Sequence, residues 1–239
     1  MDLIFHLNLL SPSCRSLYIF ARLSSISFQM ETVDLMKAEH HSEDFIQMNP
    51  LMKVPVMKDG DFILGESVAI LLYLCRKFRA PDHWYPADAQ KCGLVDEYLA
   101  WQQANIKKHC AKVLWLKMVI PHFFKCPVPQ KCLDEAITKL TQSLDMLEMK
   151  FLRNKLFLAG DQISLADLMA LEDLIQVISV GFNVFKNWPW IKIWMGRVEA
   201  TLGHELLEET RKSIMNLKNT PSLSSDTMRK FDIMKSMLF

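Results

Sequence analysis

The chain has 239 residues, half of them apolar, and its 28 basic side chains balance 27 acidic ones to a formal net charge of +1. This balance excludes the strongly basic surface typical of nucleic-acid-binding proteins, and the length allows one large domain or two smaller ones. The apolar run Val68–Cys75 is too short to cross a bilayer, and Asp2 and Arg15 interrupt the pattern of a signal peptide. We therefore expect neither a membrane-spanning helix nor secretion.

Strand and helix signals alternate at the start of the chain. Leu3–Leu10 is a compact apolar run and Phe28–Val33 alternates between apolar and polar residues, so both are predicted strands. Between them, Cys14–Leu23 carries apolar residues at helical spacing. These segments predict a strand, helix, strand unit.

A hairpin is predicted after an irregular polar stretch that ends at Pro50. Lys53–Met57 and Phe62–Leu64 flank an Asp-Gly pair, and glycine readily adopts the positive φ that a tight hairpin turn requires. A helix then begins at Ser67. The segment 79–88 contains two prolines and little periodicity, so we place the domain boundary there. The expected domains are 1–80 and 89–239, with a linker at 81–88.

The second domain is predicted to be entirely helical. Its expected helices cover residues 90–120, 130–152, 164–180, 188–202 and 204–218. The third begins with the capping-box pattern Ser164–Asp167, in which the serine hydroxyl and the acid each bind a free backbone N–H. Because this helix is apolar on nearly every side, we expect it at the centre of a bundle.

Six cysteines stand at positions 14, 75, 92, 110, 126 and 132. They have neither the density of a disulfide-stabilised secreted domain nor the C-x-x-C spacing of a zinc site. The adjacent His40 and His41 lack further ligands at metal-binding spacing, and histidines on a polar loop are usually solvated. The pattern predicts a cytoplasmic protein without a metal.

Ser11 is the principal candidate for chemistry. It ends the first predicted strand and precedes the first helix, where unpaired N–H groups and the helix dipole stabilise negative charge. The S-x-x-C pattern from Ser11 to Cys14 replaces the first cysteine of a redox motif by a hydroxyl, which donates a hydrogen bond to a thiolate but forms no disulfide. The alternative is a plain helix cap followed by Pro12 at the first helical position.

Two further stretches suggest where the rest of a ligand binds. Pro55 directly precedes the hairpin, and a cis Val54-Pro55 bond would leave the Val54 backbone free to pair with an extended peptide, although an ordinary strand-edge proline is the alternative. Glu66 and Ser67 stand at a second helix start, where they would bind an ammonium and a carboxylate group. The combination suits a ligand with an amino acid head, a peptide middle and a thiol.

The chain resembles the theta class of cytosolic glutathione S-transferases. The strings that carry the resemblance are "LLS..CR..YIF", "VDL", "NP..KVP", "KDGDFIL.ESVAILLYL" and "VDEYLAWQ", together with "SLAD", and they occur in the family's order. The resemblance implies a thioredoxin-like domain followed by an all-helical domain, a homodimer, and a role in detoxification. It also implies glutathione as cosubstrate, with no other cofactor, and a small hydrophobic electrophile as the second substrate.

The resemblance also implies roles for individual residues. Ser11 would hydrogen-bond the glutathione thiolate, and Glu66 with Ser67 would bind the γ-glutamyl end. Val54 would pair with the peptide backbone. His40 and Lys53 would lie near the glycine carboxylate, although Lys53 is equally explained as a surface charge.

Three departures from the family pattern bear on activity. Theta sequences usually read S-x-P-C-R or S-x-P-S-R, whereas here the proline is displaced by one place, to Pro12, which could re-aim the hydroxyl or let Ser13 compete. Lys107 replaces a frequent arginine and keeps the charge but not the planar fork. The tail, including Met234, could cover the electrophile pocket as an apolar face or be a frayed end. We expect Lys107 and Met234 to be candidates for contact with the electrophile.

Four functions therefore compete. The leading hypothesis is a glutathione transferase for alkyl halides, epoxides or activated esters. The first alternative is a catalytically weak or inactive glutathione-binding or ligand-binding protein on the same scaffold. The second is an interaction module without glutathione chemistry, and a cysteine-based peroxidase through Cys14 is a lesser alternative, since Cys14 is expected to point into the helix packing.

Overall fold

A mixed four-stranded sheet lies at the centre of the N-terminal half of the computed structural model, which describes residues 3–220. The strands, ordered β2-β1-β3-β4, are β1 Leu3–Leu7, β2 Gln29–Thr32, β3 Val56–Asp59 and β4 Phe62–Leu64. β1 pairs in parallel with β2 and antiparallel with β3, so that Phe5 stands opposite Met30 on one side and Met57 on the other. This arrangement is the predicted strand, helix, strand unit followed by a hairpin.

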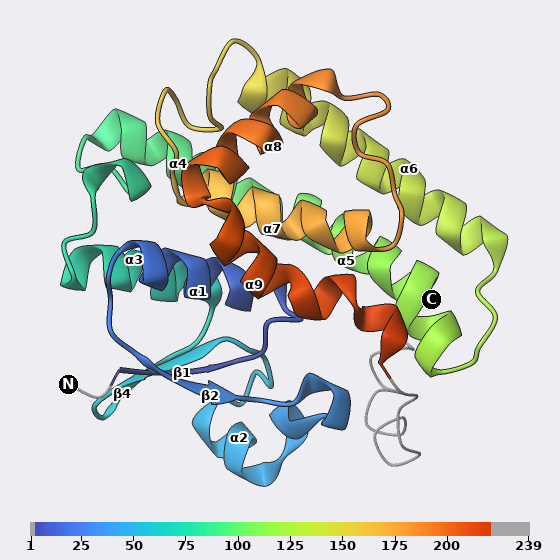
Figure 1. Ribbon diagram of the computed structural model, residues 1–239, viewed down its shortest axis with the longest axis horizontal. Helices are drawn as coiled ribbons and strands as arrows, with labels where there is room; N and C mark the ends of the chain where they lie inside the picture. The colour runs from blue at the N-terminus through green and yellow to red at the C-terminus, as the bar shows by residue number, and fades with distance from the viewer. Residues whose placement is uncertain (1–2, 221–239) are drawn as a thin grey trace.

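Helices cover both faces of the sheet. α1 (Pro12–Leu23) and α3 (Ser67–Lys77) lie side by side on the face toward the helical half, while α2 (Glu43–Met48) lies on the opposite face (Figure 1). In β1, alternate residues are buried, which is the period of a strand with one face in a core. The thioredoxin-like arrangement predicted for this half is thereby confirmed.

The first strand is shorter than predicted. It ends at Leu7 rather than at Leu10, because Asn8 turns the chain: its side-chain oxygen accepts the Leu10 N–H at 3.0 Å and its carbonyl accepts the Ser11 N–H at 2.9 Å. The first helix correspondingly begins at Pro12 rather than at Cys14. The predicted hairpin is confirmed, with Gly60 at φ 61° in its turn.

The prediction of an irregular stretch before Pro50 was wrong. The structure has two 3₁₀ turns there, Leu35–Lys37 and Glu39–His41, followed by α2. Each element is too short for apolar periodicity to be visible in the sequence. The capping residues were a usable signal: the Asp34 carboxylate accepts two backbone N–H groups and the Ser42 hydroxyl accepts the Phe45 N–H at 3.3 Å.

The first long helix of the second half is interrupted. The prediction of one helix over 90–120 was wrong, because Asn105 leaves the helical region at φ −118° and ψ −99° and separates α4 (Ala89–Ala104) from α5 (Ile106–Leu114). The Asn105 side chain donates to the Trp101 carbonyl at 2.8 Å, so it competes with the backbone of its own helix. α5 continues into a π-helical segment, Trp115–Phe123, that contains Pro121.

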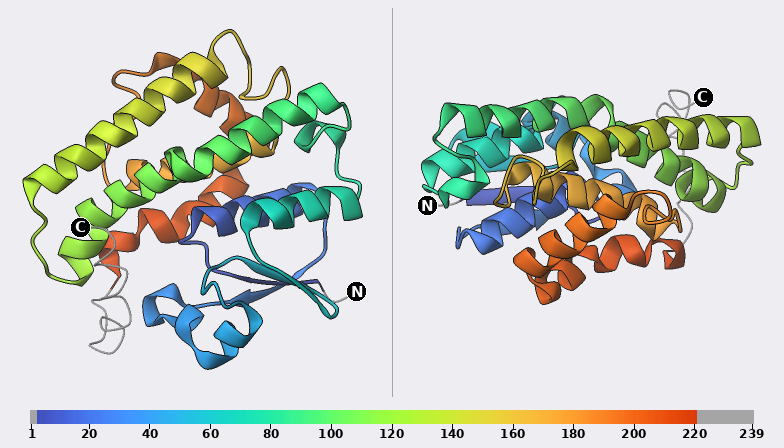
Figure 2. Two further views of the ribbon diagram at one scale, coloured as in Figure 1. Left: turned by 180° about the vertical axis from the view of Figure 1, so that it is seen from behind. Right: turned by 90° about the horizontal axis from the view of Figure 1, so that it is seen from above.

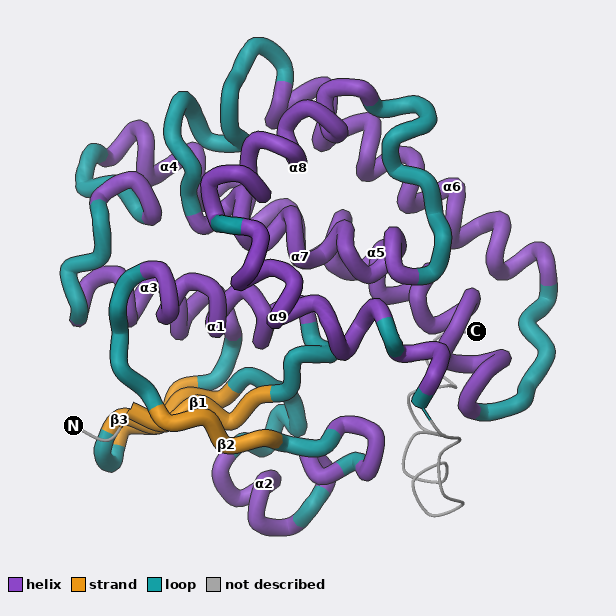
Figure 3. Tube along the Cα trace, viewed as in Figure 1, coloured by secondary structure: helices purple, strands orange, loops and turns teal. Residues whose placement is uncertain are grey.

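The remaining helices agree with the prediction. They are α6 (Gln130–Met146) with its π-helical extension Leu147–Leu152, α7 (Leu165–Ser179), α8 (Pro189–Leu202) and α9 (His204–Met215). Every residue from Leu165 to Val177 is buried, and α5 packs along α7 (Figures 2 and 3). The prediction that this nearly all-apolar helix occupies the centre of the bundle is confirmed.

None of the helices within residues 3–220 combines the length and the apolar character that a membrane span requires. Residues 81–88, the predicted linker, contain the 3₁₀ turn Asp82–Trp84. The division of the chain into domains 1–80 and 89–239 stays a prediction. Met234 and the rest of the predicted tail face lie outside the described residues.

Candidate functional site

The turn between β1 and α1 presents Ser11. Its backbone is extended at φ −78° and ψ 128°, which is the conformation that the following Pro12 favours for its neighbour. Pro12 occupies the first helical position, where its missing N–H costs no hydrogen bond. The displaced proline is therefore compatible with the backbone that a serine at the helix start requires.

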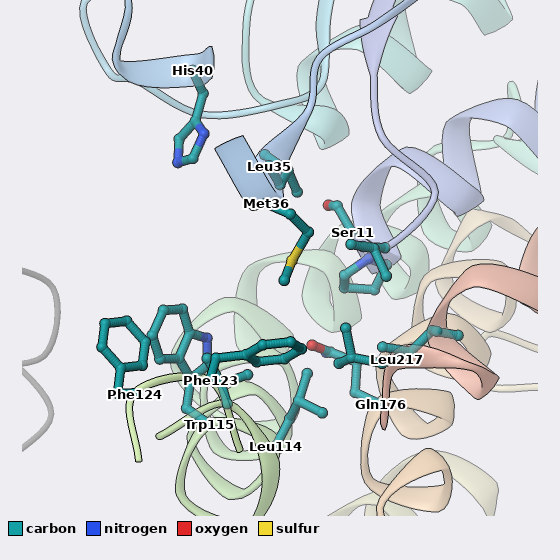
Figure 4. A pocket seen from close by; sticks show the side chains of 14 residues that line it. Ser11, Leu35, Met36, His40, Leu114, Trp115, Phe123, Phe124, Gln176 and Leu217 are labelled. Carbon is teal, nitrogen blue, oxygen red and sulfur yellow. The ribbon is translucent and has the colours of Figure 1, made fainter. Parts of the chain in front are cut away.

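The Ser11 side chain is not used as a helix cap. Although Ser11 occupies the N-cap position, its hydroxyl makes no capping hydrogen bond with α1, so the plain-cap alternative is wrong. Instead the hydroxyl lines a cavity (Figure 4). A polar group placed where a helix exposes its first N–H groups is suited to stabilising an anion.

Cys14, one turn further along α1, lies in a different environment. It is fully buried, and burial raises the pKa of its thiol to about 11, although hydrogen bonds with the Asn8 backbone and the Ser11 hydroxyl act in the opposite direction. A thiol with such a pKa is not ionised at neutral pH and is a poor nucleophile. The expectation that Cys14 points into the helix packing is confirmed.

A cavity of about 240 Å³ opens beside Ser11, between the N-terminal half and the helical half (Figure 4). Most of its lining side chains are apolar, and within residues 3–220 no aspartate, glutamate, lysine or arginine lines it. The lining residues are Leu10, Ser11, Pro12, Leu35, Met36, His40, Leu114, Trp115, Val119, Phe123, Phe124, Gln176, Ile214 and Leu217. Such a lining suits an uncharged apolar molecule that is oriented by few polar groups.

The aromatic wall of this cavity comes from the π-helical segment after α5. Trp115, Val119 and Phe123 are spaced four residues apart and line the cavity together. The Trp115 and Phe124 rings lie 6.4 Å apart, within the range of an aromatic pair. Irregular helical turns of this kind are frequent at functional sites. Pro121 was the signal in the sequence that regular α-helical hydrogen bonding is interrupted in this segment.

Gln176 is a polar residue of the cavity that sequence reasoning missed. It lies on α7, is 4% exposed and contributes an amide among the apolar side chains (Figure 4). Its amide nitrogen donates a long hydrogen bond to the Asp173 carbonyl at 3.4 Å. An amide within the apolar run 174–178 of this helix is a detectable signal, because a buried amide needs a partner.

His40 also lines the cavity, from the side opposite the aromatic wall (Figure 4). It lies on the 3₁₀ turn Glu39–His41 and is only 7% exposed, so the alternative of a solvated histidine is wrong for this residue. The His40 and His41 rings are 4.2 Å apart. Within residues 3–220 no group of three or more histidines, cysteines or carboxylates has the arrangement of a metal site.

A second group of predicted residues gathers around Asn49. The Asn49 amide donates to the Lys53 carbonyl at 2.9 Å, and a Cβ at Gly65 would lie 3.6 Å from it. Asn49 therefore brings the stretch that contains Lys53 and Val54 against the stretch that leads into α3. Lys53, Val54, Glu66 and Ser67 do not line the cavity beside Ser11.

The backbone around these residues has two special features, of which the sequence had suggested only the cis bond. The Val54-Pro55 bond is cis, and Val54 precedes β3, whose pairing with β1 starts at Val56. Glu66 has φ 64° and ψ 110°, a backbone conformation that residues other than glycine rarely adopt and that costs on the order of 1–3 kcal/mol. Glu66 is exposed, whereas Ser67 at the start of α3 is 3% exposed.

Lys107, a candidate for contact with an electrophile, does not line the cavity. It lies on α5, where its charge acts on the Cys14 thiol and on the Asp173 carboxyl. Its role toward an acceptor stays a prediction, as does that of Met234.

Both halves of the chain match known families. The family described as glutathione S-transferase, N-terminal domain, matches residues 8–76, and the one described as glutathione S-transferase, C-terminal domain, matches residues 107–201. A glutathione S-transferase theta-1 of Bos taurus is 49% identical over 220 residues, which is 92% of each chain.

Solved structures show the same likeness. The apo form of human glutathione-S-transferase T1-1 is 44% identical and superposes with a TM-score of 0.96 over 99% of both chains. A human theta-class glutathione transferase in complex with the glutathione conjugate of 1-menaphthyl sulfate is 41% identical, with a TM-score of 0.92 over 98% of both chains. The likeness therefore extends over nearly the whole chain.

Proposed function

Because the chain belongs to the theta-class glutathione S-transferases, we propose that it transfers the glutathione sulfur to small electrophiles such as alkyl halides, epoxides and activated esters. The glutathione thiolate attacks the electrophilic carbon, a sulfur–carbon bond forms, and the leaving group departs with its bonding electrons. The observation that carries this proposal is the Ser11 hydroxyl, which is unused as a cap and faces an apolar cavity at the start of α1.

Ser11 acts by keeping the glutathione sulfur ionised. A thiol of pKa near 8.5 is only a few per cent ionised at neutral pH, and lowering that pKa by about two units requires about 2.7 kcal/mol of preferential stabilisation of the thiolate. A hydrogen bond to a charged group contributes about 1.5–3 kcal/mol and a helix N-terminus up to about 2 kcal/mol. A hydroxyl donates to one group while it accepts from another, so the contact with Cys14 is compatible with donation to the thiolate.

The rest of glutathione would lie across the second group of residues. Glu66 and Ser67 at the start of α3 bind the ammonium and carboxylate of the γ-glutamyl end, and the backbone of Val54 pairs with the peptide. His40 and Lys53 lie near the glycine carboxylate. The strained φ of 64° at Glu66 supports this assignment, because such strain is concentrated at binding sites.

The acceptor occupies the cavity beside Ser11. Its lining is mostly aromatic and aliphatic and, in the part of the chain that the structure describes, contains no carboxylate, lysine or arginine, which favours small uncharged electrophiles over charged ones. The theta-class complex with a menaphthyl conjugate supports an apolar acceptor next to the sulfur in a related protein.

A substitution of Ser11 tests the proposal. Ser11→Ala is expected to raise the pKa of enzyme-bound glutathione by about one to two units and to lower kcat/KM near pH 6.5 by about tenfold to a hundredfold, since less thiolate is present. Thiolate absorbance against pH and turnover of a haloalkane and epoxide panel measure these effects. Ser13→Ala is the matched control, because Ser13 is buried on the same helix and does not line the cavity. Wild-type turnover in Ser11→Ala would remove Ser11 from the mechanism.

The weak or inactive glutathione-binding protein remains the alternative, motivated by the displaced proline. Pro12→Ala combined with Ser13→Pro restores the usual theta order of residues. If the displacement weakens catalysis, this double variant conjugates faster than the wild type at equal glutathione affinity. The extended conformation of Ser11 supports the active enzyme instead. In that case the double variant and the wild type are expected to have similar turnover.

The proposal extends to the cellular setting. We propose a cytoplasmic, detoxifying homodimer that needs no cofactor besides glutathione as cosubstrate. None of the six cysteines, which all lie within residues 3–220, forms a disulfide, and this supports a reducing compartment. Retention on glutathione resin, with the affinity measured by calorimetry, separates both glutathione-dependent functions from a docking module without glutathione chemistry.

A further inference from the structure

A fully buried arginine follows Ser11 by one helical turn and has no part in the mechanism above. Arg15 on α1 has 0% exposed side-chain surface. Its guanidinium donates four hydrogen bonds: to the carbonyls of Leu9 and Leu10, each at 3.0 Å, to the Glu172 carbonyl at 2.9 Å, and to the Glu172 carboxylate. A buried cation with this many partners is held in one position.

The two carbonyls that accept hydrogen bonds from Arg15 belong to the connection that leads into Ser11. Leu9 and Leu10 join the end of β1 to the start of α1, so their carbonyls lie outside both the sheet ladder and the helix. Asn8 holds the other side of the same turn, since its carbonyl accepts the Ser11 N–H at 2.9 Å and its amide donates to the Val33 carbonyl at 2.9 Å. The backbone before Ser11 is therefore fixed by Asn8 from the sheet and by Arg15 from the helices.

Glu172 connects Arg15 to the helical half. It lies on α7 with 0% exposed side-chain surface, and its second carboxylate oxygen accepts two hydrogen bonds from Arg211 of α9, at 3.0 and 3.2 Å. Arg211 also pairs with Glu199 of α8 at 2.6 Å. Because α9 contributes Ile214 to the cavity wall, one chain of charged contacts runs from the helix that borders the acceptor to the turn that carries Ser11.

We propose that Arg15 and Glu172 are positioning residues for the Ser11 hydroxyl, and that through them the helical half sets how well Ser11 stabilises the glutathione thiolate. This inference rests on the proposed function of Ser11. The donation of a hydrogen bond depends steeply on distance and angle, so a small movement of the Leu9–Leu10 carbonyls weakens it. Lysine at position 15 would keep the charge but could not reach two carbonyls and a carboxylate at once.

The competing explanation is that the buried charges only stabilise the fold. The two explanations differ for a double variant in which both charged partners become apolar. Arg15→Met with Glu172→Met removes both charges of the pair, and Arg211, which loses its contact with Glu172, keeps Glu199 as a carboxylate partner. Replacement of a buried ion pair by apolar residues of similar volume is often neutral or stabilising. A structural role predicts recovery of stability and activity together. A positioning role predicts recovery of thermal stability alone, because methionine donates no hydrogen bond to the Leu9 and Leu10 carbonyls.

The experiment measures the pKa of enzyme-bound glutathione, from thiolate absorbance at saturating glutathione, in the full-length protein. Arg15→Lys is expected to raise that pKa by about one unit, with kcat/KM about tenfold lower near pH 6.5 and largely recovered above pH 9. The glutathione KM is expected to change by less than about threefold. The double methionine variant is expected to melt near the wild-type temperature and to keep the raised thiol pKa.

Two reference variants make the outcome decisive. Arg22→Lys is the matched control, because Arg22 lies on the same helix and pairs with Tyr18 and Glu209 of α9 without touching the Ser11 turn. Ser11→Ala tests the proposed function itself. A raised thiol pKa in Ser11→Ala with a wild-type value in both Arg15 variants overturns only the positioning role, whereas wild-type values in all three overturn the function of Ser11. If Arg15→Lys does not fold, the double methionine variant alone decides.

Discussion

At the scale of single residues, Ser11 and Cys14 show how one turn of helix separates two environments. Both belong to the S-x-x-C pattern, yet the hydroxyl lines the cavity while the thiol is fully buried and has a pKa of about 11. Since a neutral thiol neither attacks peroxides nor binds as a thiolate, the peroxidase alternative has no support at Cys14. The same helix start therefore leaves Ser11 as the residue that would contact a sulfur.

A buried carboxyl group behind the cavity predicts an unusual dependence of stability on pH. Asp173 is 2% exposed, and among the described residues one of its side-chain oxygens accepts no hydrogen bond. Burial raises the pKa of Asp173 to about 7; the charges of Lys107 and Arg15 lower it, and that of Glu172 raises it. The neutral acid is therefore the form that the fold favours.

Asp173→Asn is expected to stabilise the protein more as the pH rises. An unfolded aspartate has a pKa near 3.9, so between about pH 4 and pH 7 the folded state binds a proton that the unfolded state has lost. The free energy of unfolding of the wild type thus falls across this window, by up to about 4 kcal/mol for a shift of about three units. Asparagine does not ionise and escapes this loss. Urea unfolding at pH 4.5 and pH 8 measures the difference.

Asp161→Asn supplies the comparison for this prediction. Asp161 is exposed in the loop before α7, and its replacement is expected to change stability by the same small amount at both pH values. An equal gain for Asp173→Asn at pH 4.5 and pH 8 would show that the carboxyl is already ionised in the folded protein.

At the scale of elements, the capping box at the start of α7 does more than cap the helix. The Asp167 carboxylate is fully buried and accepts hydrogen bonds from the Ser164 N–H at 2.9 Å, the Ser164 hydroxyl at 3.0 Å, the Leu158 N–H at 2.8 Å and the Trp194 indole at 2.8 Å. One side chain thereby joins α7 to the preceding loop and to α8. The sequence pattern predicts the contact with Ser164 but not the other two.

Asp167→Asn is expected to lower the free energy of unfolding by about 3 kcal/mol or more, because hydrogen bonds to a buried charge contribute about 1.5–3 kcal/mol each and the amide would place a donor against other donors. Ser164→Ala, which keeps the carboxylate, is expected to cost only about 1 kcal/mol. Thermal and urea unfolding at pH 7 measure both.

Asp88→Asn is the matched control for this element. Asp88 caps α4 from an exposed position, where asparagine caps equally well, so a change within about 0.5 kcal/mol is expected. A similar cost at positions 88 and 167 would contradict the special role of the buried contacts.

At the scale of the whole molecule, the N-terminal half exposes an apolar surface on its edge strand. Phe62 and Ile63 on β4 are 46% and 43% exposed, and Phe62 packs against Tyr73 of α3 with ring centroids 5.2 Å apart. A shallow groove along α3 lies beside them, lined by Ala69, Leu72, Tyr73, Arg76 and Lys77. An exposed edge strand with apolar side chains is normally covered, and a second copy of the chain is the partner we propose.

Phe62→Asp is expected to convert the proposed homodimer to a monomer, because a carboxylate cannot be buried there without a partner. Light scattering after size exclusion should then give the 27.8 kDa of one chain instead of twice that mass. Trp190→Asp serves as the control, since Trp190 is 60% exposed on α8, in a different part of the chain, and its replacement should leave the dimer intact. A monomeric wild type would contradict the proposed dimer directly.

The sequence by itself determined the features that depend on neighbouring residues. Alternation, helical spacing, the Asp-Gly turn and the capping box predict the order of the elements, and the junction before α1 identifies Ser11, because each of these signals spans only a few positions. The same signals misjudged the first strand end, the break at Asn105 and the short α2, where side chains compete locally with the backbone or where the element is shorter than one period.

Only the tertiary structure decided which residues share the cavity and what holds it. Gln176 and Ile214 line the cavity beside Ser11 from helices far along the chain, and Arg15 binds its partner Glu172 across 157 positions of sequence. Such neighbours leave no periodic trace, because they are brought together by the burial of helix faces rather than by local spacing. The position of the Ser11 hydroxyl was thus predictable from a short segment, while its surroundings depend on the packing of both halves.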